Sequence, residues 1–149
     1  MTQQPQPSTP EAPHLQTFSL PSFAENRGRL TCLDLQACDS QFPFPVQRVF
    51  WITEVGEGEK RGSHAHRRCW EALLAVGGSF KLKIDNGHDA PWVETVSSPH
   101  KGVIIPPMVW CELFDFTPGC ACLCFASGSY DQEGYLKTYS DFLHAVKAQ

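Results

Sequence analysis

The stretch Arg61-Gly62-Ser63-His64-Ala65-His66 places two histidines two residues apart. In an extended strand the side chains at positions i and i+2 point to the same face, so we expect His64 and His66 to lie side by side. A carboxylate, Glu71, follows five residues after His66. Paired imidazoles beside a carboxylate suit either a metal site or acid and base catalysis. The interpretation of the whole chain depends on which of these two sites the motif forms.

The bulk composition is that of one soluble globular domain, because the 149 residues are 42% hydrophobic and 19% charged. The formal net charge of −4 gives no electrostatic basis for general nucleic-acid binding. No stretch approaches about 20 consecutive apolar residues, so we expect no membrane span. Residues 1–13 lack the basic start and apolar core of a signal peptide. These features predict a cytoplasmic protein.

The seven cysteines are odd in number and irregular in spacing, which argues against a disulfide framework. We expect them to be reduced. Cys120, Cys122 and Cys124 alternate with smaller or apolar residues, as one face of a strand does. They are interpreted as small buried apolar side chains.

Two regions differ in composition. Residues 1–16 hold four prolines among Gln, Ser and Thr, which is typical of a flexible tail. The single ordered domain is expected at 17–149. Within it, short runs of aromatic and β-branched residues recur roughly every ten residues with turn residues between them, which predicts an all-β sandwich or barrel. Besides the histidine strand, the expected strands are 29–35, 48–55, 71–76, 80–84, 92–96, 102–105, 111–116 and 121–126.

Local signals add two expectations. Gly77-Gly78-Ser79 predicts a hairpin that joins strands 71–76 and 80–84. From about Ser140 to Ala148 the apolar residues form one face, which predicts a short C-terminal helix with Ser140 as its N-cap.

The spacing Gly58-x5-His64-x-His66-x4-Glu71-x6-Gly78 resembles the first sequence motif of the cupin superfamily. The resemblance implies an all-β fold, the cupin-type double-stranded β-helix or jelly-roll barrel. In metal-binding cupins the two histidines and the glutamate are ligands, and a second motif supplies another histidine. The corresponding region at 102–111 has the proline turn but no histidine. Trp110 or Cys111 stands about where that ligand would be.

A longer resemblance covers about Leu30 to Leu143. Arg-Val-Phe-Trp-Ile at 48–52, Arg-Gly-Ser-His-Ala-His-Arg at 61–67 and Tyr-Asp-x-x-x-Tyr at 130–135 occur in this order. Together they resemble the sugar-nucleotide 3,4-ketoisomerase family of cupins. These enzymes convert dTDP-4-keto-6-deoxyglucose into a 3-keto isomer. They act without a metal, as homodimers that exchange N-terminal strands. The resemblance implies the same here: a dTDP-linked 4-keto-6-deoxy sugar as ligand, a homodimer and no cofactor.

Two positions depart from the family pattern. Trp51 stands where the family usually carries a tyrosine, and an indole cannot replace a phenol as proton donor and acceptor. Glu71 stands where glutamine is common in the family. A carboxylate there restores a metal ligand or raises the pKa of a neighbouring imidazole.

Moving a ketone from C4 to C3 requires a proton to leave C3 and a proton to reach C4, through an enediol or enediolate. We expect His64 and His66 to share this work, one as base and one as acid, without assigning which is which. Arginine suits the diphosphate because its guanidinium gives charge-assisted contacts to phosphate oxygens. The first choice is Arg61, followed by Arg48 and Arg67. Trp110 and Tyr130 are candidate contacts for the sugar or thymine ring.

Two other functions stay open. One is a metal-dependent cupin enzyme of the dioxygenase type that uses His64, His66 and Glu71. The other is a non-catalytic module that binds a sugar nucleotide without converting it. For the isomerase, the residues leave open the configuration of the product at C4 and the glycan that receives the sugar.

Overall fold

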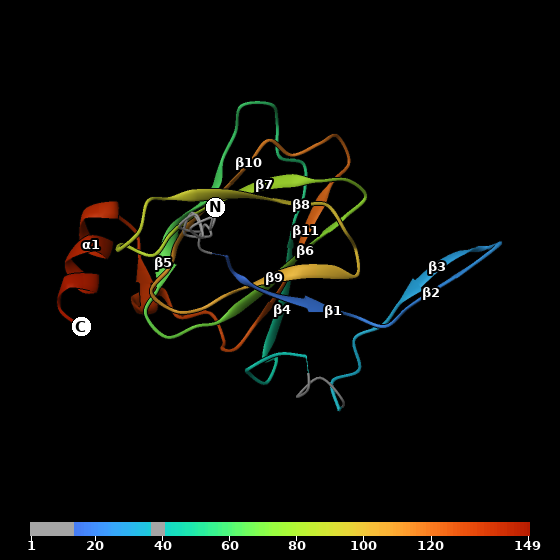
Figure 1. The fold of residues 1–149 in the computed structure, drawn as a ribbon, viewed down its shortest axis with the longest axis horizontal. Coiled ribbons are helices and arrows are strands. Elements are labelled where there is room, and N and C mark those ends of the chain that lie inside the picture. Colours follow the sequence, from blue (N-terminus) through green and yellow to red (C-terminus); the bar gives the residue numbers. More distant parts are fainter. Residues whose placement is uncertain (1–13, 37–40) are drawn as a thin grey trace, which may run out of the picture.

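The computed structural model describes residues 14–36 and 41–149. In this part of the chain the strands form two five-stranded sheets and a two-stranded hairpin, and one α-helix follows near the C-terminus (Figure 1). All strand pairs are antiparallel. The first sheet has the order β1 (Gln16–Ser19), β9 (Lys101–Ile105), β6 (Glu71–Val76), β11 (Ala121–Ala126), β4 (Arg48–Ile52). The second has the order β12 (Tyr135–Leu136), β5 (Arg61–His66), β10 (Trp110–Phe114), β7 (Phe80–Asp85), β8 (Trp92–Val96).

The two sheets pack as a jelly roll, which confirms the all-β fold with a short C-terminal helix. Alternation along the strands builds the core between the sheets. In β7, for example, Phe80, Leu82 and Ile84 are buried while Lys81 is exposed. Leu73 of β6 and the corresponding inward residues of β9, β10 and β11 complete this core. The sheets face each other rather than closing into one continuous barrel.

Two smaller clusters cover the outer faces of the sheets. Phe18, Leu20, Phe42 and Phe44 pack on the outer face of the first sheet, against residues that include Phe125. On the second sheet, α1 (Tyr139–Lys147) lays Phe142 and Val146 against Ala65 and Trp110. Strand β5 therefore packs against α1 through Ala65, between the two histidines.

The hairpin predicted at Gly77-Gly78-Ser79 is wrong. β6 pairs with β9 and β11, whereas β7 pairs with β8 and β10, so this turn carries the chain from one sheet to the other. Gly78 has a packing reason instead, because a Cβ there would lie 2.1 Å from Oγ1 of Thr117.

Two predicted boundaries are also corrected. The strand expected at 29–35 is only β3 (Gly28–Thr31), and it pairs with β2 (Ser22–Glu25). The helix begins one residue earlier than expected, at Tyr139. Its N-cap is Thr138 rather than Ser140, since Oγ1 of Thr138 accepts a hydrogen bond from the backbone N–H of Asp141 at 3.1 Å.

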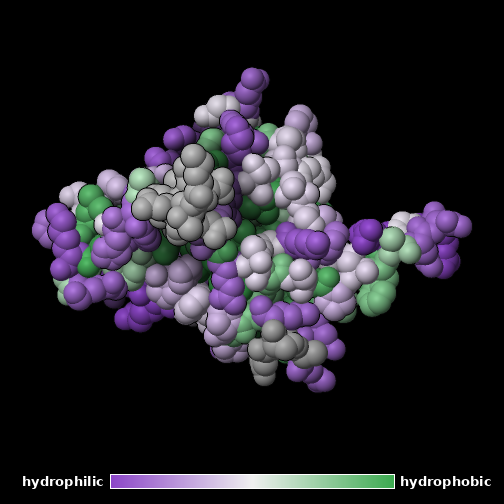
Figure 2. All heavy atoms as spheres, in the orientation of Figure 1, coloured by the Kyte–Doolittle hydropathy of each residue, from purple (hydrophilic) through white to green (hydrophobic). Residues whose placement is uncertain are grey.

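The β2–β3 hairpin projects from the body as an arm, at the end of the molecule opposite α1 (Figure 1). Phe23 and Leu30 on this arm are 63% and 62% exposed. Figure 2 shows hydrophobic surface on the arm behind a hydrophilic tip. Most of the tail expected at 1–16 lies outside the described residues; residues 14 and 15 lead directly into β1, which begins at Gln16. Among the described residues, no helix has both the length and the apolar character needed to cross a membrane.

Candidate active site

A β-bulge immediately precedes the histidines. Cys111 pairs with His64, but Glu112 pairs with Gly62, so Ser63 is an extra residue on β5. Gly62 and Ser63 both have positive φ, 83° and 58°. Glycine adopts this conformation readily and serine does so at a cost. Such bulges re-aim side chains next to active sites, and here the bulge sets the direction in which His64 and His66 leave the strand.

The two imidazoles form a cluster with a third ring, that of Tyr135. The ring centroids of His64 and His66 are 4.9 Å apart. The ring of Tyr135 lies 5.0 Å from His64 and 4.4 Å from His66. Tyr135 is brought there by β12, which pairs with β5 so that Tyr135 lies opposite His66. Residues 69 positions apart in sequence thus meet across one strand pair.

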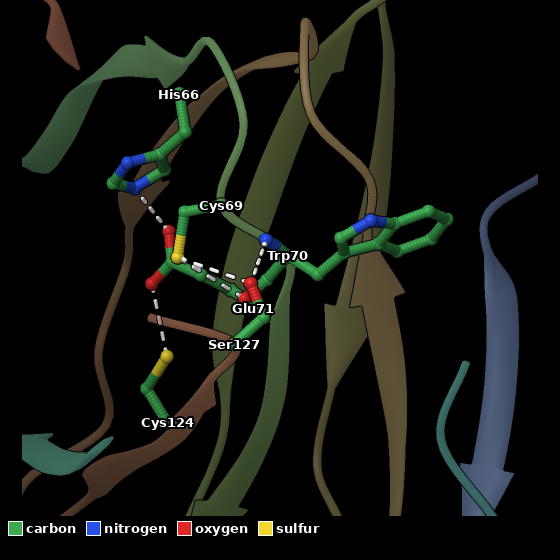
Figure 3. Close-up of polar contacts among 6 residues, drawn as sticks. All are labelled: His66, Cys69, Trp70, Glu71, Cys124 and Ser127. Carbon is green, nitrogen blue, oxygen red and sulfur yellow. Dashed lines mark hydrogen bonds and ion pairs between the residues drawn. The ribbon is translucent and has the colours of Figure 1, made fainter. Parts of the chain in front are cut away.

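The buried carboxylate of Glu71 lies next to the imidazole of His66 in this cluster. Its Oε1 lies 2.5 Å from Nε2 of His66. The thiol of Cys124 donates to Oε2 at 2.9 Å. Figure 3 shows His66 and Cys124 approaching the carboxylate from opposite sides. Cys124 was expected to be a simple core residue, and it is buried, but it also positions Glu71.

The start of β6 is fixed by backbone contacts. The N–H of Trp70 donates to Oγ of Ser127 at 2.8 Å (Figure 3). The N–H of Ser127 donates to the carbonyl of Trp70 at 2.9 Å. Because Glu71 follows directly, these bonds restrict where its side chain can reach.

Burial and neighbouring groups determine the protonation states of His64 and Glu71. Burial and the nearby His66 lower the pKa of His64, so at neutral pH its imidazole is uncharged and able to accept a proton. Burial opposes the charge on Glu71, but His66 and the thiol of Cys124 outweigh it and lower the pKa of Glu71. Glu71 is therefore ionised at neutral pH.

A pocket of about 430 Å³ opens beside the histidines. Its wall combines a base, a carboxylate and two cations with apolar side chains. The lining residues are Phe50, Trp51, Ile52, Lys60, Arg61, Gly62, His64, Glu71, Leu73, Ile105, Cys111, Leu113 and Tyr135. A second pocket of about 270 Å³ is lined by His66 together with Arg48 and Tyr135. Tyr135 belongs to both walls, and the two histidines face different pockets.

The site residues expected from the sequence do not all line the same pocket. His64 and Arg61 line the first pocket, and His66 and Arg48 line the second. Arg67 lies on neither wall.

The two aromatic candidates also lie outside the first pocket. Tyr130 is 65% exposed, with the guanidinium of Arg48 5.9 Å from its ring. Trp110 is buried under α1, 5.9 Å from the ring of Phe142. The reason is strand alternation: adjacent residues of β10 face opposite sides, so Cys111 faces the pocket and Trp110 faces the helix.

Tyr135 was missed as a site residue. Its signal in the sequence is the second tyrosine of the motif Tyr-Asp-x-x-x-Tyr at 130–135.

His64, His66 and Glu71 offer ligand atoms that all lie within 4.8 Å of one another. Such a set fits a divalent metal with open coordination positions. The residue opposite His64, Cys111, does not complete it well, because burial raises the pKa of its thiol far above the ordinary range and keeps it protonated.

Comparison with known proteins agrees with this geometry. The family model described as "FdtA: WxcM-like, C-terminal" matches residues 13–147. The chain is 31% identical over 118 residues to the TDP-4-oxo-6-deoxy-alpha-D-glucose-3,4-oxoisomerase of Aneurinibacillus thermoaerophilus, which covers 79% of this chain and 82% of the relative.

Solved structures give the same result. A mutant of the 3,4-ketoisomerase QdtA from Thermoanaerobacterium thermosaccharolyticum, in complex with TDP-4-keto-6-deoxyglucose, superimposes with a TM-score of 0.83 at 30% identity, over 91% of this chain and 95% of that one. A 3,4-ketoisomerase from Helicobacter canadensis gives a TM-score of 0.81 at 26% identity, over 90% and 99%.

The jelly roll and its inward histidine pair define an isomerase of the cupin fold, as the resemblance in sequence implied. The chain belongs to the FdtA (WxcM-like, C-terminal) family, and its relatives named above are sugar-nucleotide 3,4-ketoisomerases. They favour this activity over the metal-dependent dioxygenase and the non-catalytic module.

Proposed function

We propose that this protein converts dTDP-4-keto-6-deoxyglucose into a dTDP-3-keto-6-deoxyhexose. The observation that carries the proposal is the first pocket, where the uncharged imidazole of His64 shares a wall with Arg61 and Lys60. A base for a hydrogen alpha to a ketone and cations for a diphosphate are the two requirements of this reaction. The substrate named for the relatives, a TDP-4-keto-6-deoxy sugar, supports the choice.

Within this reaction we assign the carbon-bound proton to His64. His64 takes the proton from C3, the electrons form the C3–C4 double bond of the enediolate, and His64 returns the proton to C4. His66 lies 4.9 Å from His64 and is paired with Glu71 behind it, so it holds the ring of His64 in place and lowers its pKa. This division is sharper than the equal sharing expected from the sequence.

The diphosphate is assigned to Arg61, with Lys60 beside it. Lys60 also pairs with Glu112 at 3.4 Å, which leaves Arg61 as the stronger candidate. We assign no substrate contact to Arg48, Arg67, Trp110 or Tyr130, because they do not line this pocket. No metal or organic cofactor takes part in the proposed steps.

One incubation with dTDP-4-keto-6-deoxyglucose, followed by NMR of the product, tests the reaction and gives the configuration at C4. His64→Asn should lower kcat by at least about 100-fold, the usual contribution of a positioned base. His66→Asn should lower it less. Retention of the C3 hydrogen at C4 in heavy water would support one shuttling base. An equal loss in both variants would contradict the division of roles.

We also propose a homodimer that exchanges N-terminal strands. The β2–β3 arm carries exposed Phe23 and Leu30. On the body, β4 is an edge strand, and its Val49 and Trp51 are 46% and 66% exposed. Edge strands and exposed apolar side chains are surfaces that proteins usually cover. Trp51 then serves the interface between subunits and does not replace the family's phenol.

The product's new ketone is the functional group that an aminotransferase consumes, so we place the reaction before such an enzyme in the synthesis of a deoxysugar of an O-antigen or S-layer glycan. The free thiols of exposed Cys32 and half-buried Cys69 suit a reducing compartment, which supports the cytoplasm. Neither a nucleic acid nor a membrane is proposed as a partner.

A further inference from the structure

The second pocket, of about 270 Å³, has no part in the proposed reaction. Among the described residues, Tyr135 alone belongs to the walls of both pockets, so the second pocket is a separate space behind the first. Its wall is polar and contains two arginines, a histidine and two serines, with a single carboxylate, that of Asp131. Such a wall suits a polar ligand, and the balance of its charges indicates the sign of that ligand.

Arg48 is the cation of this wall that has no acidic partner. In the described part of the chain, no carboxylate oxygen lies within 4.0 Å of its guanidinium. Its neighbours are the ring of Phe50 at 5.1 Å, the ring of Tyr130 at 5.9 Å and the hydroxyl of Tyr135. Its Nε is buried without a hydrogen-bond partner. A half-buried guanidinium without a counter-charge is costly, so Arg48 implies an anion in this pocket.

The other charged groups near this pocket are paired with one another. Arg68 lies 3.3 Å from the carboxylate of Asp131, which also accepts a hydrogen bond from the backbone N–H of Glu133 at 3.2 Å. Glu71 does not line the pocket, because His66 and Cys124 enclose its carboxylate. The positive charge of Arg48 is therefore the one left for a ligand.

Hydrogen-bond donors from other elements face the same space. His66 is 94% buried, since its exposed fraction is 6%, and its Nε2 is turned to Glu71. Figure 3 shows the second ring nitrogen, Nδ1, on the side away from Glu71, and no described residue hydrogen-bonds it. The backbone N–H groups of Gly128 and Ser129, on the loop after β11, likewise have no partner among the described residues. Several donors around one cation are the surroundings that an oxyanion needs.

The proposed dimer leaves this pocket open. Side chains alternate along β4, so Arg48 and Phe50 face the interior, whereas Val49 and Trp51 face outward to the proposed subunit contact. The guanidinium of Arg48 therefore stays on the pocket side when a second copy covers the edge of β4.

We propose that the second pocket binds a phosphate group, held by the guanidinium of Arg48, by Nδ1 of His66 and by the backbone of Gly128 and Ser129, while a sugar nucleotide occupies the first pocket. A guanidinium matches phosphate oxygens in a bidentate geometry. The volume is close to the lower end, about 300 Å³, of small-molecule sites, so it takes either free phosphate or a small phosphate ester. This site goes beyond the proposed function and does not depend on it.

The test is calorimetric titration of inorganic phosphate into the protein saturated with dTDP, which fills the first pocket. One phosphate per chain should bind with a Kd of about 1 mM or lower. Arg48→Met should weaken phosphate at least about tenfold, because a charge-assisted contact is lost, and leave the affinity for dTDP within about twofold of the wild type. Glycerol 3-phosphate in place of phosphate distinguishes the two sources of the ligand: the tighter of the two identifies whether the site takes the free ion or an ester.

The matched control is Arg61→Met, which removes the corresponding cation of the first pocket. It should weaken dTDP at least about tenfold and leave phosphate affinity, measured without dTDP, within about twofold of the wild type. Gly128→Asp keeps the test decisive if Arg48→Met does not fold. A Cβ at Gly128 would meet nothing within 4 Å, so the variant should fold, and its carboxylate should weaken phosphate at least about tenfold.

Two results would overturn the phosphate site. One is a dTDP-saturated protein that binds no phosphate, which would place any phosphate in the first pocket. The other is a phosphate affinity within about twofold of the wild type in Arg48→Met, or in Gly128→Asp if the first variant is unfolded. A protein that binds no dTDP would instead count against the proposed function, and the same variants, titrated with phosphate alone, would then decide the second pocket.

Discussion

The side chain of Glu71 is only 7% exposed, yet it is charged. Burying a lone carboxylate is costly, and the cost is offset here by the imidazole of His66 at one oxygen and a thiol donor at the other. Because the folded pKa lies below the ordinary 4.5, the folded state favours the ionised form. The resulting stability is present above about pH 4.5 and is lost as the pH falls through the folded pKa.

Glu71→Gln should therefore lower the free energy of unfolding by about 2 kcal/mol at pH 7, since the amide keeps a polar contact but not the charge. Urea denaturation at pH 7 and at pH 4 measures the free energy of unfolding. The difference in this free energy between the variant and the wild type should be smaller at pH 4. Asp115→Asn is the control, because its ion pair with Lys81 is on the surface and should be worth less than about 1 kcal/mol. A stability difference that does not change with pH would show that the charge of Glu71 contributes nothing to the free energy of unfolding.

His64 makes a prediction for the pH dependence of the rate. Its pKa is lowered by burial and by His66, so the basic form persists below the ordinary value of 6.5. The plot of kcat/KM against pH should stay level through pH 6.5 and decline only as the pH falls through the lowered pKa. In His66→Gln the electrostatic effect of the second imidazole on His64 is gone, and the decline should move toward higher pH. A wild-type decline centred above pH 6.5 would contradict an uncharged His64.

Period-two spacing placed His64 and His66 side by side, and their rings are 4.9 Å apart, while Arg61 lines the first pocket; the roles of all three stay predictions. The sequence could not predict Tyr135, whose position depends on β12 pairing with β5 across a long separation. It also misplaced Trp110, because whether residue 110 or 111 faces inward depends on the register of β10 with β5 and β7, which spacing alone does not give.

Among the elements, the bulge in β5 determines how the histidines are presented. Gly62 has φ of 83°, and a Cβ there would lie 3.0 Å from the carbonyl oxygen of Cys111. Gly62→Ala should cost about 1–3 kcal/mol of stability and lower kcat through displaced imidazoles. Ser63 already has a side chain at φ of 58°, so Ser63→Gly should be within about 1 kcal/mol of the wild type.

Thermal denaturation and turnover of both variants measure these effects. Equal stability of Gly62→Ala and the wild type would show that the bulge tolerates a different backbone conformation.

The positions of the strands in the sequence were more predictable than the pairing between strands. A continuous apolar run located β6 and apolar alternation located β7, because burial of both faces or of one face leaves a local pattern. The turn at Gly77-Gly78 was misjudged because a glycine pair serves a tight hairpin and a close packing contact equally well. Only the contact of Gly78 with Thr117, 39 residues later, distinguishes the two.

For the whole molecule, the β2–β3 arm leads to a prediction about assembly. Exposed Phe23 and Leu30 should lie against a second copy of the chain. The double variant Phe23→Asp with Leu30→Asp should shift the protein from dimer to monomer in size-exclusion chromatography with light scattering. Arg27→Gln at the tip of the arm, where the surface is hydrophilic, should leave the dimer intact. A wild-type protein that elutes as a monomer at micromolar concentration would refute the exchange of strands.

The position of Tyr135 has a consequence for folding during synthesis on the ribosome. The histidines are synthesised well before β12 and α1, which pack against their strand. A nascent chain that has emerged only through Ala126 can pair β6 with β11 and ionise Glu71, but one wall of its pocket is still missing. Such a chain has the base but lacks the wall that Tyr135 completes, so isomerase activity should arise only after β12 has been synthesised, and a truncation before Tyr135 should be inactive even where the other strands have paired.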